Sequence, residues 1–429
     1  MIVLALLLFA PLHSKAQFQW LTNNGTVTLT FYGGPGGLVT VPGIITGLPV
    51  TRILWRVFAG NQNITSITLP GSITDLDDGS LTACAHLTNI TVDPSNPNYT
   101  SVSGVLFNNN LTTLAAYPGG LSGPYVVPDG VTNISGGAFG SAGVTAVSLP
   151  NTLIAIGSGS FACPYLTNIF IPASVTSIGA NAFACAVTVD PLNSSYSSAD
   201  GVFFDKTQTL LIHYPNADPR KSYIIPASVT SIGASAFDQC ENLTNILIPE
   251  GVTNLGSHAF DYCDRITKIR IPSRLTNIPE EAFASCTHLT SVVIPAGVTN
   301  IESAAFENSG VTAVYFEGNA PTVMTDAFHS GWNKTIFYMP GTTGWSPTFA
   351  GSPTVLWNPQ MQQARVQANS FGFTITGTTG LVVVVEASTN LSNSIWQALS
   401  TNTLTAGASS FSDSAWSNFP SRFYRLRSP

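Results

Sequence analysis

Only 9% of the 429 residues are Asp, Glu, Lys or Arg, against about 25% in ordinary soluble domains. The formal net charge is −7 and no run of basic residues occurs, which argues against nucleic acid or an anionic membrane surface as a partner. Because 44% of the chain is hydrophobic, its surface must be covered largely by Thr, Ser, Asn and Gly.

An apolar segment opens the chain. Ile2–Leu12 is almost wholly apolar, and Ser14 and Ala16 place small residues at the two positions that signal peptidase reads. We expect residues 1–16 to be a secretory signal, and therefore a secreted, extracellular or cell-surface protein. The segment is too short to span a membrane, and no later stretch is long and apolar enough to do so.

Residues 17–47 are predicted to form an N-terminal β-hairpin cap. The stretch VTLTFY alternates between apolar and polar residues, Gly33–Gly37 turns, and LVTVP alternates again. Such a cap would shield the first unit of a repeat array from water.

A repeat of 22 or 23 residues dominates the rest of the chain. Residues 225–306 read IPASVTSIGASAFDQCENLTNIL, IPEGVTNLGSHAFDYCDRITKIR, IPSRLTNIPEEAFASCTHLTSVV and IPAGVTNIESAAF. A fixed period of this length indicates a solenoid, in which a unit buries its apolar face only by stacking on its neighbours. We expect a mainly β solenoid over residues 48–340.

Within one unit we place Leu243, Ile246 and Ile248 inward, and Asn245 and Leu247 outward. β-branched side chains suit such a half-buried strand. Neighbouring strands lie about 4.8 Å apart, so equivalent positions should stack in columns from coil to coil.

Two longer stretches, residues 92–118 and 189–215, resemble each other. Both contain Val-Asp-Pro, a Tyr, Gly-Val-x-Phe, a Leu pair and Tyr-Pro. We expect each to be a hairpin-like variant coil that keeps the stack going.

The repeat degrades after Phe306. Residues 341–357, rich in turns and aromatic residues, are predicted as a C-terminal cap, and residues 358–367 as a linker. Residues 368–429 contain short strands separated by Gly, Ser and Asn, which predicts a small β-sandwich-like module.

The run I-P-x-x-V-T-x-I-x-x-x-A-F-x-x-C-x-x-L-T-x-I resembles the BspA-type leucine-rich repeats of bacterial secreted and surface proteins, and the two variant stretches resemble that family too. The resemblance covers roughly residues 48–340. It implies a right-handed leucine-rich-repeat solenoid and, as in characterised members, adhesion or protein binding. The C-terminal module is similar to β-rich tails of other secreted bacterial proteins, which implies no function.

Six cysteines occupy one slot of the repeat, two or three residues after its Phe or after the equivalent Leu81. They are Cys84, Cys163, Cys185, Cys240, Cys263 and Cys286. A secreted chain invites disulfides, but a single interior column favours buried free thiols. A bridge from Cys263 to Cys240 or Cys286 stays open, subject to the coil geometry.

No pattern predicts a metal, cofactor or catalytic site. His86 and His288 share an exposed turn slot, and neither His-x-x-x-His nor Cys-x-x-Cys spacing occurs. The acidic stretch Asp75–Gly79 lacks the spacing and the closing Glu of a calcium loop, so a solvated turn is favoured. No nucleophile elbow or phosphate loop is present.

One strip of outward strand positions is a candidate binding site. The late coils place Leu247, Lys268, Arg270, Val293 and Tyr315 side by side, whereas the early coils are bland. Aromatic, aliphatic and Arg side chains compose binding hot spots; scattered surface variation is the alternative.

The hypothesis from sequence is therefore a non-catalytic binding or adhesion scaffold for a protein or glycan partner. A polysaccharide-active enzyme and a passive surface-structural protein are the alternatives. An enzyme would need a cluster of acids and bases with perturbed pKa values on one wall.

Overall fold

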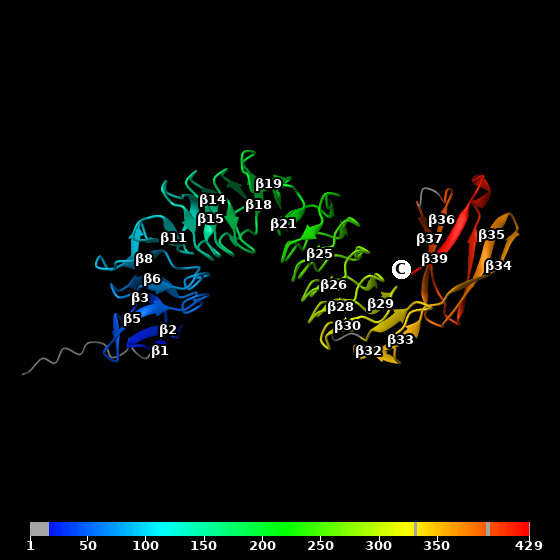
Figure 1. Cartoon of the computed structure of the whole chain (residues 1–429), viewed down its shortest axis with the longest axis horizontal. Coiled ribbons are helices and arrows are strands. Elements are labelled where there is room, and N and C mark those ends of the chain that lie inside the picture. The colour runs from blue at the N-terminus through cyan, green and yellow to red at the C-terminus, as the bar shows by residue number, and fades with distance from the viewer. Residues whose placement is uncertain (1–16, 330–332, 392–394, 429) are drawn as a thin grey trace, which may run out of the picture. The chain divides into compact units, whose positions relative to one another are not determined.

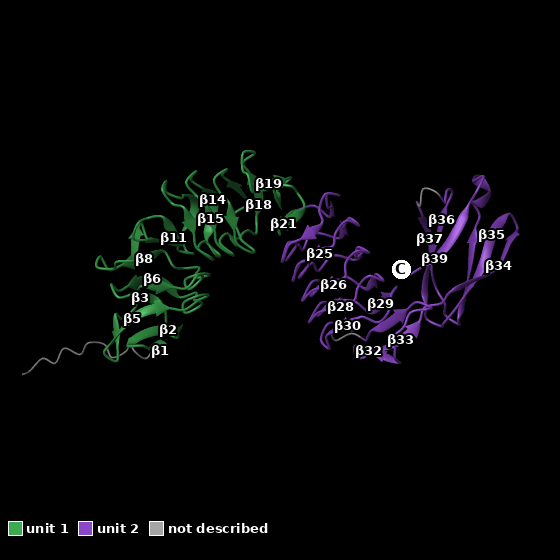
Figure 2. Ribbon diagram, in the orientation of Figure 1, with its two compact units in different colours: residues 1–218 green, residues 219–429 purple. Residues whose placement is uncertain are grey.

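The computed structural model describes residues 17–329, 333–391 and 395–428, so the predicted signal lies outside the described residues. Short β-strands make up nearly all of the regular structure, as Figure 1 shows. The chain forms two compact units, one up to Asp218 and one from Pro219 onward (Figure 2). In each unit the strands of successive coils pair in parallel, which confirms the predicted β-solenoid.

Unit 1 begins with an antiparallel hairpin of β1 (Phe18–Asn23) and β2 (Thr26–Tyr32). The hairpin predicted from the sequence joined β2 to the strand after Gly33–Gly37, and that pairing is wrong. This strand, β3 (Gly37–Thr40), instead runs parallel to β6 (Ile64–Leu69). It already belongs to the coil stack, because pairing with β6 buries its apolar side chain Val39.

The first variant stretch forms a meander of β9 (Tyr99–Val102), β10 (Val105–Asn108) and β11 (Thr113–Ala116). β11 then pairs in parallel with β13 (Asn133–Ile134), so the prediction of a hairpin-like coil that continues the stack is confirmed. The second stretch repeats the meander with β19 (Tyr196–Ala199), β20 (Val202–Asp205) and β21 (Leu210–His213).

A buried asparagine fixes each meander. In the second one, the Asn193 amide donates to the carbonyls of Pro172 and Val175, and its oxygen accepts from the backbone N–H groups of Ser195 and Tyr196. Asn96 makes the equivalent four bonds in the first meander. The nitrogen and the oxygen of each buried side-chain amide are therefore both hydrogen-bonded, as buried polar groups must be.

The other strands of unit 1 are short and, apart from β4, which pairs antiparallel with β5, stack in parallel. They are β4 (Ile44–Ile45), β5 (Leu48–Ile53), β7 (Asp75–Leu76), β8 (Asn89–Val92), β12 (Ser122–Val126), β14 (Gly143–Ser148), β15 (Ala155–Ile156), β16 (Asn168–Ile171), β17 (Ser177–Ile178) and β18 (Ala186–Val189).

The repeat strands of unit 2 line two walls and continue into residues 341–357, the stretch predicted as a cap. They are β22 (Ser222–Ile224), β23 (Ser231–Ile232), β24 (Asn245–Leu247), β25 (Asn254–Leu255), β26 (Asn277–Ile278), β27 (Ser291–Ile294), β28 (Asn300–Ile301), β29 (Ala313–Phe316), β30 (Thr322–Val323), β31 (Thr335–Tyr338), β32 (Thr348–Phe349) and β33 (Ser352–Leu356). Leu243, Ile246 and Ile248 are buried and Leu247 is exposed, as predicted.

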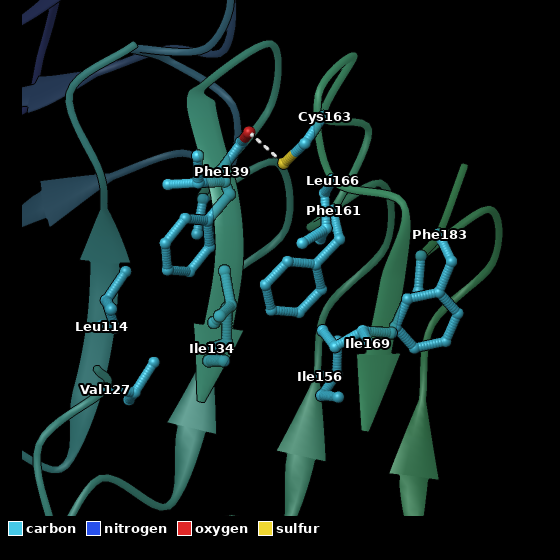
Figure 3. Packing of buried hydrophobic residues seen from close by; sticks show 14 of the residues in the cluster. Leu114, Val127, Ile134, Phe139, Ile156, Phe161, Cys163, Leu166, Ile169 and Phe183 are labelled. Atoms are coloured by element: carbon cyan, nitrogen blue, oxygen red, sulfur yellow. Dashed lines mark hydrogen bonds between the residues drawn. The ribbon is translucent and has the colours of Figure 1, made fainter. Parts of the chain in front are cut away.

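The Ile-Pro and Ala-Phe motifs of the repeat are its two corners. After each strand the Pro carbonyl accepts a hydrogen bond from the N–H three residues on, as from Val252 to Pro249. At the second corner the Phe rings stack: Phe260 lies 4.9 Å from Phe237 and 5.4 Å from Phe283, between ring centroids. Figure 3 shows the same column in unit 1.

The Ala-Phe corner has a backbone conformation that the sequence does not predict. The residues two before and two after the Phe are left-handed at six of these corners, although few of them are glycine; the corners are those of Phe58, Phe139, Phe237, Phe260, Phe283 and Phe306. Around Phe260 they are His258 (φ 56°) and Tyr262 (φ 53°). Such residues cost about 1 kcal/mol or more each. In return, the N–H groups of all three residues point to the next coil and donate to the carbonyls of Glu280, Ala282 and Ala284.

All six cysteines are buried thiols that form no disulfide, which confirms the preferred prediction. The sequence did not reveal their hydrogen bonds. The Cys263 thiol donates to the Phe237 carbonyl of the preceding coil at 3.0 Å, and Cys163 donates likewise to Phe139, the dashed line in Figure 3. The slot thus combines a small apolar side chain with a donor for a buried carbonyl.

Residues after the cap form a second, all-β part of unit 2. Two three-stranded sheets have the strand orders β34-β35-β38 and β37-β36-β39. Their elements are β34 (Gln360–Gln367), β35 (Ser370–Thr376), β36 (Val382–Ser388), β37 (Gln397–Thr403), β38 (Ala408–Asp413), the 3-10 helix η2 (Trp416–Asn418) and β39 (Phe423–Arg427). We call residues 358–428 the C-terminal module.

The predicted linker, residues 358–367, is wrong for most of its length. Gln360–Gln367 forms β34, which pairs antiparallel with β35. Its Gln-rich sequence resembles a linker because every residue of this edge strand is exposed. Backbone pairing with β35, rather than burial of side chains, holds it in the sheet.

We expect Phe260→Ala to destabilise the fold by about 3–5 kcal/mol, because it opens a cavity between two stacked rings. Phe260→Leu keeps most of the volume and should cost clearly less. Urea unfolding of the full-length chain, followed by circular dichroism, measures both. Equal costs for the two variants would contradict the filling of volume as the main contribution of this side chain.

The thiols should be unreactive in the folded protein. Desolvation raises the pKa of Cys84 from 9.0 to about 11 and that of Cys163 to about 12, so both stay protonated at pH 8. A thiol reagent should label none of the six cysteines at pH 8, and all six after denaturation.

The same shifts predict how stability depends on pH. Because the folded pKa is raised, unfolded thiols ionise first, and stability should fall as the pH rises from about 9 through about 12. Rapid labelling of native protein, or constant stability over this range, would contradict thiol burial.

Candidate functional site

The five residues predicted as a binding strip lie on one wall of unit 2. Leu247 ends β24, and a bridge pairs Arg270 with Val293. β27 and β29 then place Val293 beside Tyr315. Lys268 lies two residues before Arg270, on the same exposed face. The equal spacing of the coils therefore brings these residues into neighbouring positions.

Tyr315 does not lie on an open surface, contrary to the expectation from sequence. It points out of its coil, but only 1% of it is exposed. It stacks on Phe337 at 4.7 Å, and both rings belong to an apolar cluster that includes Phe373 and Val385 of the C-terminal module. The repeat alone could not show this, because the covering residues come from a different part of the chain.

A groove of about 690 Å³ opens where the strip emerges from this cluster. The solenoid wall contributes Leu247, Lys268, Arg270 and Val293, four of the five predicted residues. The C-terminal module forms the facing side. Its contribution consists of Glu386, Trp396, Arg425, Arg427 and Ser428.

The cations of the solenoid side are available to a partner. Lys268 is exposed, and its ammonium group makes no hydrogen bond or ion pair with any residue that the structure describes. Arg270 pairs with Glu250 at 3.0 Å, but 78% of the Arg270 side chain is exposed. Such solvent-exposed pairs contribute about 1 kcal/mol at most, so a carboxylate from a partner could replace Glu250.

The facing side is more rigid. Glu386 is buried and accepts hydrogen bonds from Arg425 and Arg427. Desolvation alone would raise the pKa of Glu386, but the two arginines leave it lowered. The Arg425 guanidinium also lies 4.4 Å from the centre of the Trp396 ring. This network fixes an aromatic surface and two cations opposite Lys268.

The third acid of the groove differs from the other two. Desolvation raises the pKa of Glu317, Arg270 opposes the shift and Glu250 adds to it. The Glu317 carboxylate makes no hydrogen bond or ion pair with any residue that the structure describes. Glu386 stays ionised between two arginines and Glu250 is tied to Arg270, so the geometry favours recognition of charge over proton transfer.

Sequence reasoning missed the groove residues of the C-terminal module. A usable signal was present: in the stretch RFYRLR, Arg425 and Arg427 are two apart and therefore share one face of a strand. Glu386 interrupts the valine run of β36 and was equally visible as a buried charge in need of a partner.

The other candidates take the positions that the sequence suggested. His86 and His288 are exposed. In the acidic stretch near Asp75, the Arg52 side chain pairs with Asp75 at 3.1 Å and with Asp77 at 2.7 Å. These carboxylates thus serve an ion pair across adjacent coils.

Coils of 22 or 23 residues, stacked through parallel strands and a shared Phe column, define a β-solenoid repeat protein. A profile of the "BspA type Leucine rich repeat region" matches residues 44–118, 125–210 and 214–333, in six copies. The match covers more than half of the chain, and the chain belongs to this family of leucine-rich repeat proteins.

Three solved structures illustrate the likeness. The pneumococcal vaccine antigen PcpA is 17% identical, covering 80% of this chain and 96% of that one, with a TM-score of 0.50. A leucine-rich cell surface protein from Faecalibacterium prausnitzii A2-165 is 27% identical (70% and 86%; TM-score 0.47). A leucine-rich repeat protein from Eubacterium ventriosum is 20% identical (76% and 77%; TM-score 0.39).

The likeness to PcpA supports the solenoid fold and nothing further. No curated protein matches this chain. Over the described ranges, no helix has the length and apolar character needed to cross a membrane.

Replacing Glu386 with Ala should loosen the C-terminal module. The change removes charge-assisted hydrogen bonds to Arg425 and Arg427, which contribute about 1.5–3 kcal/mol each at most. The net loss is smaller than their sum, because water can hydrate both arginines in the variant. We expect a loss of about 2 kcal/mol in thermal unfolding. Glu250→Ala is the matched control, because it breaks an exposed pair and should cost less than about 1 kcal/mol. Equal losses would contradict the rigid side of the groove.

Proposed function

We propose that this protein is an exported, non-catalytic binding and adhesion scaffold whose ligand site is the groove of unit 2. The observation that carries the proposal is the meeting of exposed cations and apolar side chains in one concave place. The Lys268 ammonium group pairs with none of the described residues, Arg270 is held by an exposed pair, and Leu247 is 49% exposed.

The partner class that fits is a protein segment that carries carboxylates next to apolar side chains. Lys268, Arg270 and the fixed Arg425 would meet the carboxylates. The apolar side chains would find Leu247 and the neighbouring Ile224, which is 71% exposed. Arg and aromatic residues in a desolvated groove are typical of binding hot spots. An acidic glycan is the second candidate, since the same cations would bind its carboxylates.

Display at the cell surface is part of the proposal. The apolar segment Ile2–Leu12 favours export. The low content of charged residues and the family's leucine-rich repeats agree with a scaffold that binds outside the cell.

The test uses the full-length chain against a panel of immobilised extracellular proteins and glycans. The variant Lys268→Glu/Arg270→Glu reverses the solenoid side of the groove and should weaken binding of the protein partner at least about ten-fold. The matched control is Arg265→Glu/Arg274→Glu, which makes the same charge change at exposed positions outside the groove lining.

Three results would contradict the proposal. The first is a groove variant that binds as tightly as the unaltered protein. The second is a control variant that loses as much affinity as the groove variant. The third is a panel in which no member binds the unaltered protein. Binding confined to acidic glycans would replace the protein partner by the second candidate.

A further inference from the structure

A cluster outside the groove lining brings together three side chains that ligate metals. The Nδ1 atom of His258 lies 3.2 Å from a carboxylate oxygen of Glu281 and 3.5 Å from one of Asp261. Each of the three offers one ligand atom, and these atoms all lie within 4.8 Å of one another. It is the one such group found among the residues that the structure describes.

The repeat itself builds the cluster. His258 and Glu281 each lie two residues before the Phe of their coil, so they occupy the same position in adjacent coils. Both are left-handed, with φ of 56° and 51°, and the His258 N–H donates to the Glu280 carbonyl. The backbone therefore holds the two side chains one above the other. Asp261, one residue after the Phe, joins them from the His258 coil.

Asp261 is the observation that points to a ligand. Only 6% of the residue is exposed, and its Oδ1 atom accepts no hydrogen bond from any described residue. Its Oδ2 atom has a long contact of 3.5 Å to His258 Nδ1. A neutral imidazole has one N–H, so Nδ1 can donate to Asp261 or to Glu281 but cannot satisfy both. A buried carboxylate in this situation is costly unless a cation compensates it.

We propose that His258, Asp261 and Glu281 form a divalent-cation site that links two adjacent coils, with Zn²⁺ as the ion that fits best. Zn²⁺ binds nitrogen and carboxylate oxygen at about 2.0–2.2 Å, which puts ligand atoms of a tetrahedral site about 3.3–3.6 Å apart. The distances from His258 Nδ1 are close to this spacing, at 3.5 Å to Asp261 and 3.2 Å to Glu281.

The charge and exposure of the cluster agree with this assignment. Two carboxylates balance a charge of +2, and one imidazole favours zinc over calcium, which prefers six to eight oxygen ligands. The side chains of His258 and Glu281 are 39% and 34% exposed, so the ion could enter from solvent and water could complete its coordination.

Sequence spacing did not reveal the site, because its ligands come from two coils. His258 and Glu281 are separated by one full repeat of 23 residues, which no short motif contains. Reading the repeats in register would have placed the histidine above the glutamate, with Asp261 at its side.

The test is a calorimetric titration of the full-length chain with Zn²⁺, repeated with Ca²⁺, together with thermal unfolding in Zn²⁺ and in chelator. We expect one Zn²⁺ per chain, weaker binding of Ca²⁺, and a melting temperature that rises with Zn²⁺. His258→Gln and Glu281→Gln should each weaken Zn²⁺ binding at least about ten-fold, since even losing a residue that only supports a ligand costs about 10–100-fold.

Glu280→Gln is the matched control: it makes the same charge change at the adjacent, exposed acid and should bind Zn²⁺ normally. Both ligand variants alter half-exposed side chains, and circular dichroism without metal confirms that they fold. The proposal is overturned if the unaltered chain shows no saturable binding, if both ligand variants bind as it does, or if the control loses as much as they do.

Discussion

The coils of this protein are held in register at the Ala-Phe corner, and the rest of the structure depends on that register. At the corners of Phe139, Phe237, Phe260 and Phe283, three alternate residues donate their N–H groups to the next coil while the Phe ring between them stacks on its neighbours. Two of the three are left-handed, so the corner stores backbone strain that only the adjacent coil offsets. A single unit would have no reason to keep this conformation, which agrees with solenoids being stable only as arrays.

Constant register turns sequence differences between coils into surface features. On the strand wall it aligns Leu247, Arg270 and Val293, and at the corner it stacks His258 over Glu281. The residues on the strand wall face the C-terminal module, and the two sides together form the groove. The stacking at the corner places nitrogen and oxygen ligands within reach of one ion. Both the groove and the ligand cluster arise because these side chains depart from the repeat while the backbone follows it.

The repeat was predictable because burial and stacking impose one pattern on every coil. Inward Leu243 and Ile246, the Phe column and the unbridged cysteines followed from position in the period alone. The exceptions share a cause: Tyr315 is covered by the distant C-terminal module, β3 pairs with β6 across a coil, and exposed β34 is held by backbone pairing. The period of the repeat predicts none of these contacts: the first two join segments far apart in sequence, and the third is a local hairpin outside the repeat.

Amide hydrogen exchange of the full-length chain tests the register most directly. The N–H groups of Ser235, Phe237 and Gln239 lie at a corner outside the strands, yet all three donate to the following coil. The account predicts that they exchange as slowly as the paired amides of β29. If they exchange at the rate of open turns, the corner does not hold the coils in register.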